Sequence, residues 1–199
     1  MGRVIAVVLA VAVASGAALA GCGTAAAPQS SSSPSPSAIA RPHNQADITF
    51  AQDMIPHHTQ AVTMSWMAMG RAASPQVQGL ADRIRSAQQP EIDQMKGWLD
   101  GWNATPPADA HHHMGNMDHG GGAMPGMISG DQLNQLGQLS GAAFDRMFLQ
   151  MMITHHQGAI AMAKTELGSG QSPEARQLAQ RVIDAQQHEI TEMQALLGG

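Results

Sequence analysis

The stretch FAQDMIPHHTQAVTM at residues 50–64, together with FLQMMITHHQGAIAM at residues 148–162, decides the fold of this 199-residue chain. At a constant offset of 98 positions, 21 of the 50 residues from 50 to 99 are identical to their counterparts. The match needs no gap, and a shared helical composition does not produce so many identities. The chain therefore contains two copies of one structural unit.

Each copy is predicted to be a hairpin of two helices. The first helix ends near Gly70 or Gly168, because glycine is the favoured helix terminator. Ser-Pro pairs at 74–75 and 172–173 then supply an N-cap followed by the first helical residue. The second helix of the first copy carries apolar residues with the spacing of a buried stripe, at positions 80, 84, 87, 92, 95 and 99. Two such hairpins bury their stripes most simply as an all-α four-helix bundle.

The first helix of each copy has histidine within its apolar stripe, which runs through positions 50, 54, 57, 61, 64 and 68. Met54 lies one turn before the adjacent His57 and His58, so these side chains can share one ion. Met64 lies about 10.5 Å beyond His57 along the helix axis and would belong to a different site. The second copy repeats the pattern with Met152, His155, His156 and Met162.

The second helix of each hairpin offers partners for these histidines. If the turn centres near residue 72, His57 faces residues 87–91 of the antiparallel helix. Glu91 and its counterpart Glu189 are candidates to fix the tautomer of a metal-bound imidazole. His188 is a candidate additional ligand.

Pro56 interrupts the predicted first helix, at the place where the second copy has Thr154. Proline has no N–H to donate to the carbonyl of Gln52, and its ring crowds the preceding turn. Either the helix starts late, or it kinks beside His57.

Core packing is the alternative explanation for methionine at helical spacing. This explanation is preferred for four methionines, namely Met67, Met95, Met147 and Met193. Two adjacent imidazoles that recur in both copies, with methionine one turn away, have no obvious packing purpose. The pattern of the His-His pairs therefore favours metal binding.

Residues 103–130 form an insert between the two copies that is rich in His, Met, Gly and Pro. Because this composition does not form a helix with a buried face, the methionines of the insert are expected to be solvent-accessible. Thioethers prefer Cu(I), and imidazole accepts Cu(II), Cu(I), Zn or Ni. A flexible linker with chance His and Met is the alternative. The candidate ligands are His111, His112, His113, Met114, Met117, His119, Met124 and Met127.

The N-terminal segment 1–21 is typical of an export signal, with an apolar run too short to span a bilayer. It ends in Leu-Ala-Gly-Cys, which resembles the bacterial lipobox and implies acylation of Cys22, with chains such as palmitate. A cleaved signal with a chance cysteine is the alternative. Residues 22–43, dominated by Ala, Ser and Pro, are expected to form a disordered tether. The bundle is expected over residues 44–199.

The composition of the chain argues against several classes of protein and of metal site. With Lys+Arg 10 against Asp+Glu 15, a net charge of −5 disfavours a nucleic-acid partner. A single cysteine excludes an intramolecular disulfide framework and all-cysteine metal sites. A di-iron or di-manganese oxidase built on a four-helix bundle needs Glu-x-x-His motifs. None occurs, since the glutamates are Glu91, Glu166, Glu174, Glu189 and Glu192.

The duplicated motif, Met-Ile before His-His and a second helix with Gln-Gln-x-Glu-Ile, resembles the DUF305 family over residues 46–198. The resemblance implies a ferritin-like four-helix bundle in an exported protein. Some members of the family are implicated in copper binding and tolerance. That implication reaches this chain through Met54, His57, His58 and Met64, and through Met152, His155, His156 and Met162.

The leading hypothesis is an extracytoplasmic copper-binding lipoprotein, not an enzyme, that buffers or delivers copper at the bacterial cell membrane. Cu(I) is favoured and Cu(II) is possible, with two Met and two His as ligands, one pair from each copy. The predicted partners are the membrane, through the lipid anchor, and a copper-handling envelope protein. The alternatives are a metal-free envelope interaction module, a Zn or Ni binder, and a di-metal oxidase. The oligomeric state is not predicted.

Overall fold

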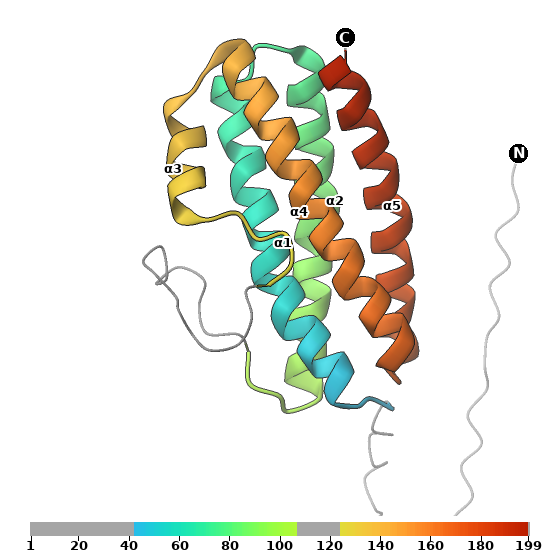
Figure 1. Ribbon diagram of the computed structural model, residues 1–199. Coiled ribbons are helices and arrows are strands. Elements are labelled where there is room, and N and C mark those ends of the chain that lie inside the picture. Colours follow the sequence, from blue (N-terminus) through green and yellow to red (C-terminus); the bar gives the residue numbers. More distant parts are fainter. Residues whose placement is uncertain (1–41, 107–123, 199) are drawn as a thin grey trace, which may run out of the picture. The chain divides into compact units, whose positions relative to one another are not determined.

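The computed structural model describes residues 42–106 and 124–198, and these residues form helices and no strand. The helices are α1 (Gln45–Arg71), α2 (Pro75–Gly101), α3 (Gly130–Gln138), α4 (Gly141–Ser169) and α5 (Pro173–Gly198). The four long helices pack side by side (Figure 1), which confirms the predicted all-α bundle of two hairpins. The predicted signal segment, Cys22, most of the tether and the insert ligands from His111 to His119 lie outside the described residues.

The helix ends follow the capping signals. Asn44 caps α1 by accepting hydrogen bonds from the N–H groups of Ala46 and Asp47. Ser74 and Ser172 are the N-caps of α2 and α5, as predicted, and each is followed by proline. The first helix runs without interruption from Gln45 through Pro56. Of the two alternatives for Pro56, the late helix start is therefore wrong.

The two hairpins are joined by one long crossover. In Figure 1, α1 runs opposite to α2 and to α4, whereas α2 and α4 run in the same direction. The connection must therefore return along the length of the bundle, as in bundles with a single crossover. The short helix α3 lies on this return path and buries Leu133 and Leu136.

The sequence pattern predicts helix from about Asp131 onward, and the structure divides this region. Leu139 and Ser140 have extended backbone, and Gly141 has a φ of 66°. Glycine adopts this left-handed conformation at little cost, so the chain can turn there and begin α4 in a new direction. The bundle consequently carries α3 as a fifth helix that the periodicity does not separate from α4.

The predicted buried stripe of α1 is confirmed at every position, namely Phe50, Met54, His57, Ala61, Met64 and Ala68. One position of the α2 stripe is wrong, because Ala87 is exposed and Gln88 is buried in its place. Steps of four residues from Ile84 to Ile92 pass through Gln88, which keeps it on the buried face. Met95 and Met193 are core residues, and Met67 and Met147 pack against the core, as expected.

Two aspartates at equivalent positions tie the hairpins together. Asp145 accepts hydrogen bonds from the N–H groups of Ala73 and Ser74, at 3.1 and 2.9 Å, in the turn of the first hairpin. Asp47 accepts a hydrogen bond from the N–H of Ser172, at 2.8 Å, in the turn of the second hairpin. Each copy therefore caps the turn of the other, as an approximate two-fold axis between α1 and α4 requires.

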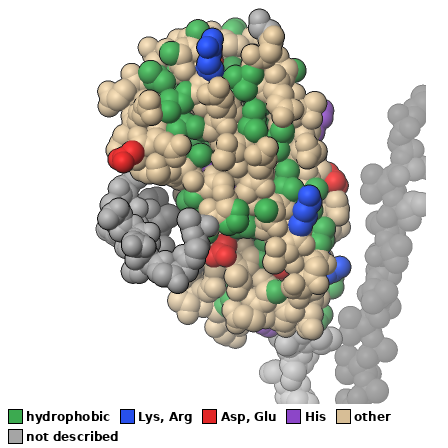
Figure 2. Space-filling view, viewed as in Figure 1, with side chains coloured by type: hydrophobic (Ala, Val, Ile, Leu, Met, Phe, Trp, Pro, Cys, Tyr) green, Lys and Arg blue, Asp and Glu red, His purple; other side chains and the backbone are tan. Residues whose placement is uncertain are grey.

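The described residues contain no helix with the length and apolar character needed to cross a membrane. On the face shown in Figure 2, the Lys and Arg side chains are isolated points separated by polar and apolar surface. Histidine is barely visible on this face, because the His-His pairs of both copies lie inside the bundle.

Candidate metal centre

The two copies bring their histidines together in the middle of the bundle. The rings of His57, on α1, and His155, on α4, have centroids 3.7 Å apart and planes tilted by 34°. Both side chains have 0% exposure. Because these residues are counterparts at the offset of 98, the approximate two-fold axis passes between their rings.

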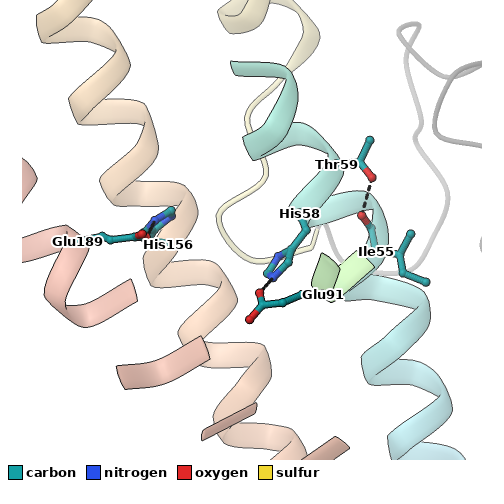
Figure 3. Close-up of polar contacts among 6 residues, drawn as sticks. All are labelled: Ile55, His58, Thr59, Glu91, His156 and Glu189. Atoms are coloured by element: carbon teal, nitrogen blue, oxygen red, sulfur yellow. Dashed lines mark hydrogen bonds and ion pairs between the residues drawn. The ribbon is translucent and has the colours of Figure 1, made fainter. Parts of the chain in front are cut away.

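The other histidine of each pair contacts a glutamate within its own hairpin (Figure 3). His58 Nε2 lies 2.9 Å from Glu91 Oε2, and His156 Nε2 lies 2.7 Å from Glu189 Oε2. The sequence pattern predicts these carboxylates opposite His57 and its counterpart, whereas in the structure they contact His58 and His156. Successive helical residues point about 100° apart, so one histidine of each pair faces the other copy and the next faces its own hairpin partner.

Several buried imidazole nitrogens of the centre have no hydrogen-bond partner within residues 42–106 and 124–198. Glu91 and Glu189 hold the Nε2 proton of their histidines, so in the neutral ring the lone pair is on Nδ1. The Nδ1 atoms of His57, His58 and His156 are buried and unpartnered, and so are both ring nitrogens of His155. Buried polar atoms without partners are rare in proteins and indicate a missing ligand, ion or water.

Burial also keeps the central rings neutral. It lowers the pKa of His57 to about 3, reinforced by the nearby His58 and opposed by a hydrogen bond to the Pro125 carbonyl. Burial, followed by the proximity of His57, holds the pKa of His155 well below its ordinary 6.5. At neutral pH both rings therefore offer lone pairs to a metal ion, and no proton has to leave first.

The structure separates the methionines into two groups. Met54 and Met152 are fully buried, one helical turn before the His pairs and on the same side of their helices. Met64 and Met162 lie two turns beyond the pairs. Met64 is in the core, and Met162 lines a pocket with Glu166. Of these four methionines, Met54 and Met152 are therefore the nearer in sequence position to the central imidazoles.

Three further predicted ligands can be placed. His188 is exposed, and the structure does not bring it to the buried pair of its own copy. Met124 and Met127 are half-buried at the end of the insert, so they are less accessible than the sequence suggests. Within residues 42–106 and 124–198, no three His, Cys, Asp or Glu side chains are grouped as a cage for one ion. The two imidazoles are in contact at this centre, and the buried Met54 and Met152 precede them by one helical turn.

Sequence reasoning missed two features of the centre. The first is the burial of Gln88 and its counterpart Gln186, whose amide groups retain unpartnered atoms. The second is residues 124–128, called the strap below, which contact His57. His57 Nε2 donates to the carbonyl oxygen of Pro125 over 3.1 Å. No periodic pattern identifies the strap, because its contacts come from the end of a low-complexity insert.

Comparison with known proteins connects this arrangement to a family. Residues 47–197 match a family described as a domain of unknown function, DUF305. A DUF305 protein of Streptomyces coelicolor, assigned as secreted, is 34% identical with a TM-score of 0.67, covering 77% of this chain and 91% of that one. A DUF305 fragment of Deinococcus radiodurans is 31% identical with a TM-score of 0.66, covering 79% and 98%.

The chain is also similar to CopM, which has been solved with metals. The Cu(II)-bound form is 34% identical with a TM-score of 0.64, covering 76% of this chain and 95% of CopM. Cu(I)-bound and Ag-bound forms of CopM match as well. An uncharacterised protein of Acanthamoeba polyphaga mimivirus is 42% identical over 54 residues, and the match spans only 36% of that protein.

Proposed function

The chain belongs to the DUF305 family, and from this premise we propose that its buried histidine centre binds copper in an extracytoplasmic compartment. The observation that carries the proposal is the set of unpartnered imidazole nitrogens at the contact between the two copies. A metal ion satisfies such atoms without requiring a further polar side chain.

The donor set suits a soft, low-coordinate ion. His57 and His155 supply the central nitrogens, and Met54 and Met152 supply thioethers one turn away. Thioether and imidazole together favour Cu(I), whereas Zn is usually held by four nitrogen, oxygen or thiolate ligands. The Cu(I)-bound, Cu(II)-bound and Ag-bound forms of CopM support the assignment.

The cellular role that fits these ligands is copper buffering or delivery, and not catalysis. Outside the cytoplasm thiols oxidise, whereas thioethers and imidazoles remain usable ligands. The assignment of a related DUF305 protein as secreted supports this location. Attachment through Cys22 would keep the bundle at the membrane, where a copper-handling envelope protein is the natural partner.

The test is a comparison of metals on the chain that lacks residues 1–22. Competition against a chromophoric Cu(I) chelator gives the affinity and the stoichiometry, and parallel titrations use Cu(II), Zn and Fe(II). We expect Cu(I) to bind most tightly. A second protein that also lacks residues 107–123 keeps the bundle and the strap, and we expect it to retain the tightest Cu(I) site. Equal affinities for Cu(I) and Zn would contradict the proposal.

Glu91 and Glu189 should tune the affinity without acting as ligands. Replacing both by glutamine retains an oxygen that accepts from the histidine Nε2–H but removes the negative charge. We expect Cu(I) affinity to fall by less than the about 10- to 100-fold that follows loss of an outer contact to a ligand, because His58 and His156 adjoin the donors His57 and His155 and do not belong to the donor set.

The matched control is Glu192→Gln, because Glu192 lies on the same helix as Glu189 and pairs with Arg83 at the exposed surface. Its Cu(I) affinity should equal that of the unaltered protein. If Glu192→Gln weakens Cu(I) binding as much as the double variant does, the loss of affinity comes from the change in the protein's net charge. The proposed tuning role of Glu91 and Glu189 is then wrong.

A further inference from the structure

The strap is fixed to α1 by a two-point contact. The side chain of Gln60 donates from Nε2 to the carbonyl oxygen of Ile128, and its Oε1 accepts from the N–H of Ile128, each over 2.8 Å. Ile128 itself is buried, with 6% exposure. The primary amide of one side chain therefore satisfies both backbone groups of a strap residue, as a neighbouring strand would.

At its other end the strap lies directly on the backbone of α4. A Cβ atom at Gly158 would overlap the carbonyl oxygen of Pro125, so only glycine allows this contact. Gly126 has a φ of 77°, and a Cβ there would meet the carbonyl oxygen of Thr154 at 2.7 Å. Two glycines thus permit backbone to touch backbone at this point.

The two attachment points are counterparts in the duplicated sequence. Gln60 and Gly158 are related by the offset of 98, and each follows the first histidine of its pair by three residues. On antiparallel helices they lie on opposite sides of the His57–His155 contact, about 9 Å apart along the axis. The three residue-to-residue steps from Pro125 to Ile128 span about 10 Å when extended. The strap therefore crosses the approximate two-fold axis beside the His57 and His155 rings.

This crossing makes two equivalent histidines different. His57 donates its Nε2 proton to the Pro125 carbonyl, which leaves the lone pair on Nδ1. His155 has no hydrogen-bond partner at either nitrogen in the part of the chain that the structure describes. The divergence of the copies at one position, glutamine in the first and glycine in the second, permits the strap to contact only one ring.

We propose that the strap is a positioning element of the metal centre, in which Gln60 and Gly158 hold the Pro125 carbonyl so that His57 presents Nδ1 as its donor atom. The consequence for metal affinity rests on the proposed copper function. The positioning itself does not, because the tautomer of His57 is defined in the metal-free protein.

The test uses two readouts on Gln60→Ala. Nitrogen-15 NMR of the histidine rings in the metal-free protein reports which nitrogen of His57 carries the proton, and hydrogen exchange reports the protection of the Ile128 amide. The unaltered protein should show a single Nε2–H tautomer for His57. The variant should show mixed tautomers, faster exchange at Ile128, and Cu(I) affinity reduced about 10-fold.

Two further variants make the result specific. Gly158→Ala displaces the strap from its other end without altering Gln60, and it should give the same change of tautomer. Gln157→Ala is the matched control, because Gln157 is exposed beside the second His pair; it should leave both readouts unchanged. Thermal unfolding by circular dichroism verifies that each variant is folded.

The outcomes separate this inference from the proposed function. If Gln60→Ala and Gly158→Ala both keep the single Nε2–H tautomer, the positioning role is overturned even if copper binds. If the tautomer changes in both variants while the unaltered protein shows no preference for Cu(I), the positioning role is supported and the proposed function is overturned.

Discussion

Replacing His57 and His155 together by leucine is expected to weaken Cu(I) binding by more than about 100-fold, which exceeds the usual effect of losing an outer contact. Their rings are the only point at which the two copies place imidazole against imidazole among the described residues. Leucine fills the same space without a lone pair. Competition against a Cu(I) chelator measures the loss, and X-ray absorption reports the number of nitrogen neighbours of the bound ion.

The leucine pair also separates ligand loss from loss of the fold. Both histidines are fully buried, and removing their unpartnered nitrogens is neutral or stabilising when an apolar group takes their place. Loss of the hydrogen bond from His57 to the Pro125 carbonyl opposes this gain by about 1 kcal/mol. The variant should therefore unfold at about the same urea concentration as the unaltered protein. His188→Ala, at an exposed position, is the control and should change neither property. Full Cu(I) affinity in the leucine variant would exclude this centre as the site.

The sequence predicts the bundle well because duplication and periodicity are both local signals. The offset of 98 defines the two hairpins, and the burial of the α1 stripe follows from helical geometry. Duplication also implies an approximate two-fold relation, from which the meeting of His57 and His155 can be derived once α1 and α4 are known to be neighbours. That neighbour relation is tertiary, and the helix periodicity does not contain it.

The remaining features depend on contacts that no single helix encodes. The pairing of Glu91 with His58, and not with His57, depends on how far the two helices are rotated about their axes. The strap depends on a difference between the copies at Gln60 and Gly158, where agreement between repeats gives no guidance. The burial of Gln88 follows from its place in the α2 stripe. Glutamine side chains are mostly exposed in proteins, so the residue type alone predicts exposure at this position.

A second difference between the copies lies at one end of the bundle. Glu166 of α4 has 1% exposure and lies where the first copy has Ala68. Its neighbour Asp47 already accepts backbone hydrogen bonds from the turn before α5, and neither oxygen of Glu166 has a hydrogen-bond donor among the described residues. A Cβ at Gly170 would overlap the Glu166 carboxyl group, so a larger residue in this turn would displace that side chain.

Burial, followed by the hydrogen bond and the charge of Asp47, raises the pKa of Glu166 to about 8 from its ordinary 4.5, against the opposing charge of Arg176. The folded state therefore holds this proton more tightly than the unfolded state does. The contribution of protonated Glu166 to the free energy of unfolding is fully present below pH 4.5 and is lost as the pH rises toward 8. The pKa of Asp47 is lowered from 3.8, so its own contribution changes at more acidic pH, outside this window.

Glu166→Gln is accordingly expected to stabilise the protein at alkaline pH and to have little effect near pH 5. A glutamine amide donates to Asp47 as the protonated carboxyl group does, but it does not ionise. The gain in the free energy of unfolding should reach roughly 2–4 kcal/mol by pH 8.5, measured by urea denaturation across the pH range. The difference between the two proteins cancels the contribution of the buried histidines, which titrate in both. Glu166→Ala reproduces the arrangement of the first copy, where Ala68 accompanies Asp145, and its unfolding free energy relative to the unaltered protein should likewise rise as the pH increases from 6.5 to 8. A pH profile for Glu166→Gln that runs parallel to that of the unaltered protein would show that the carboxyl group is ionised throughout, and that the proton is not shared with Asp47.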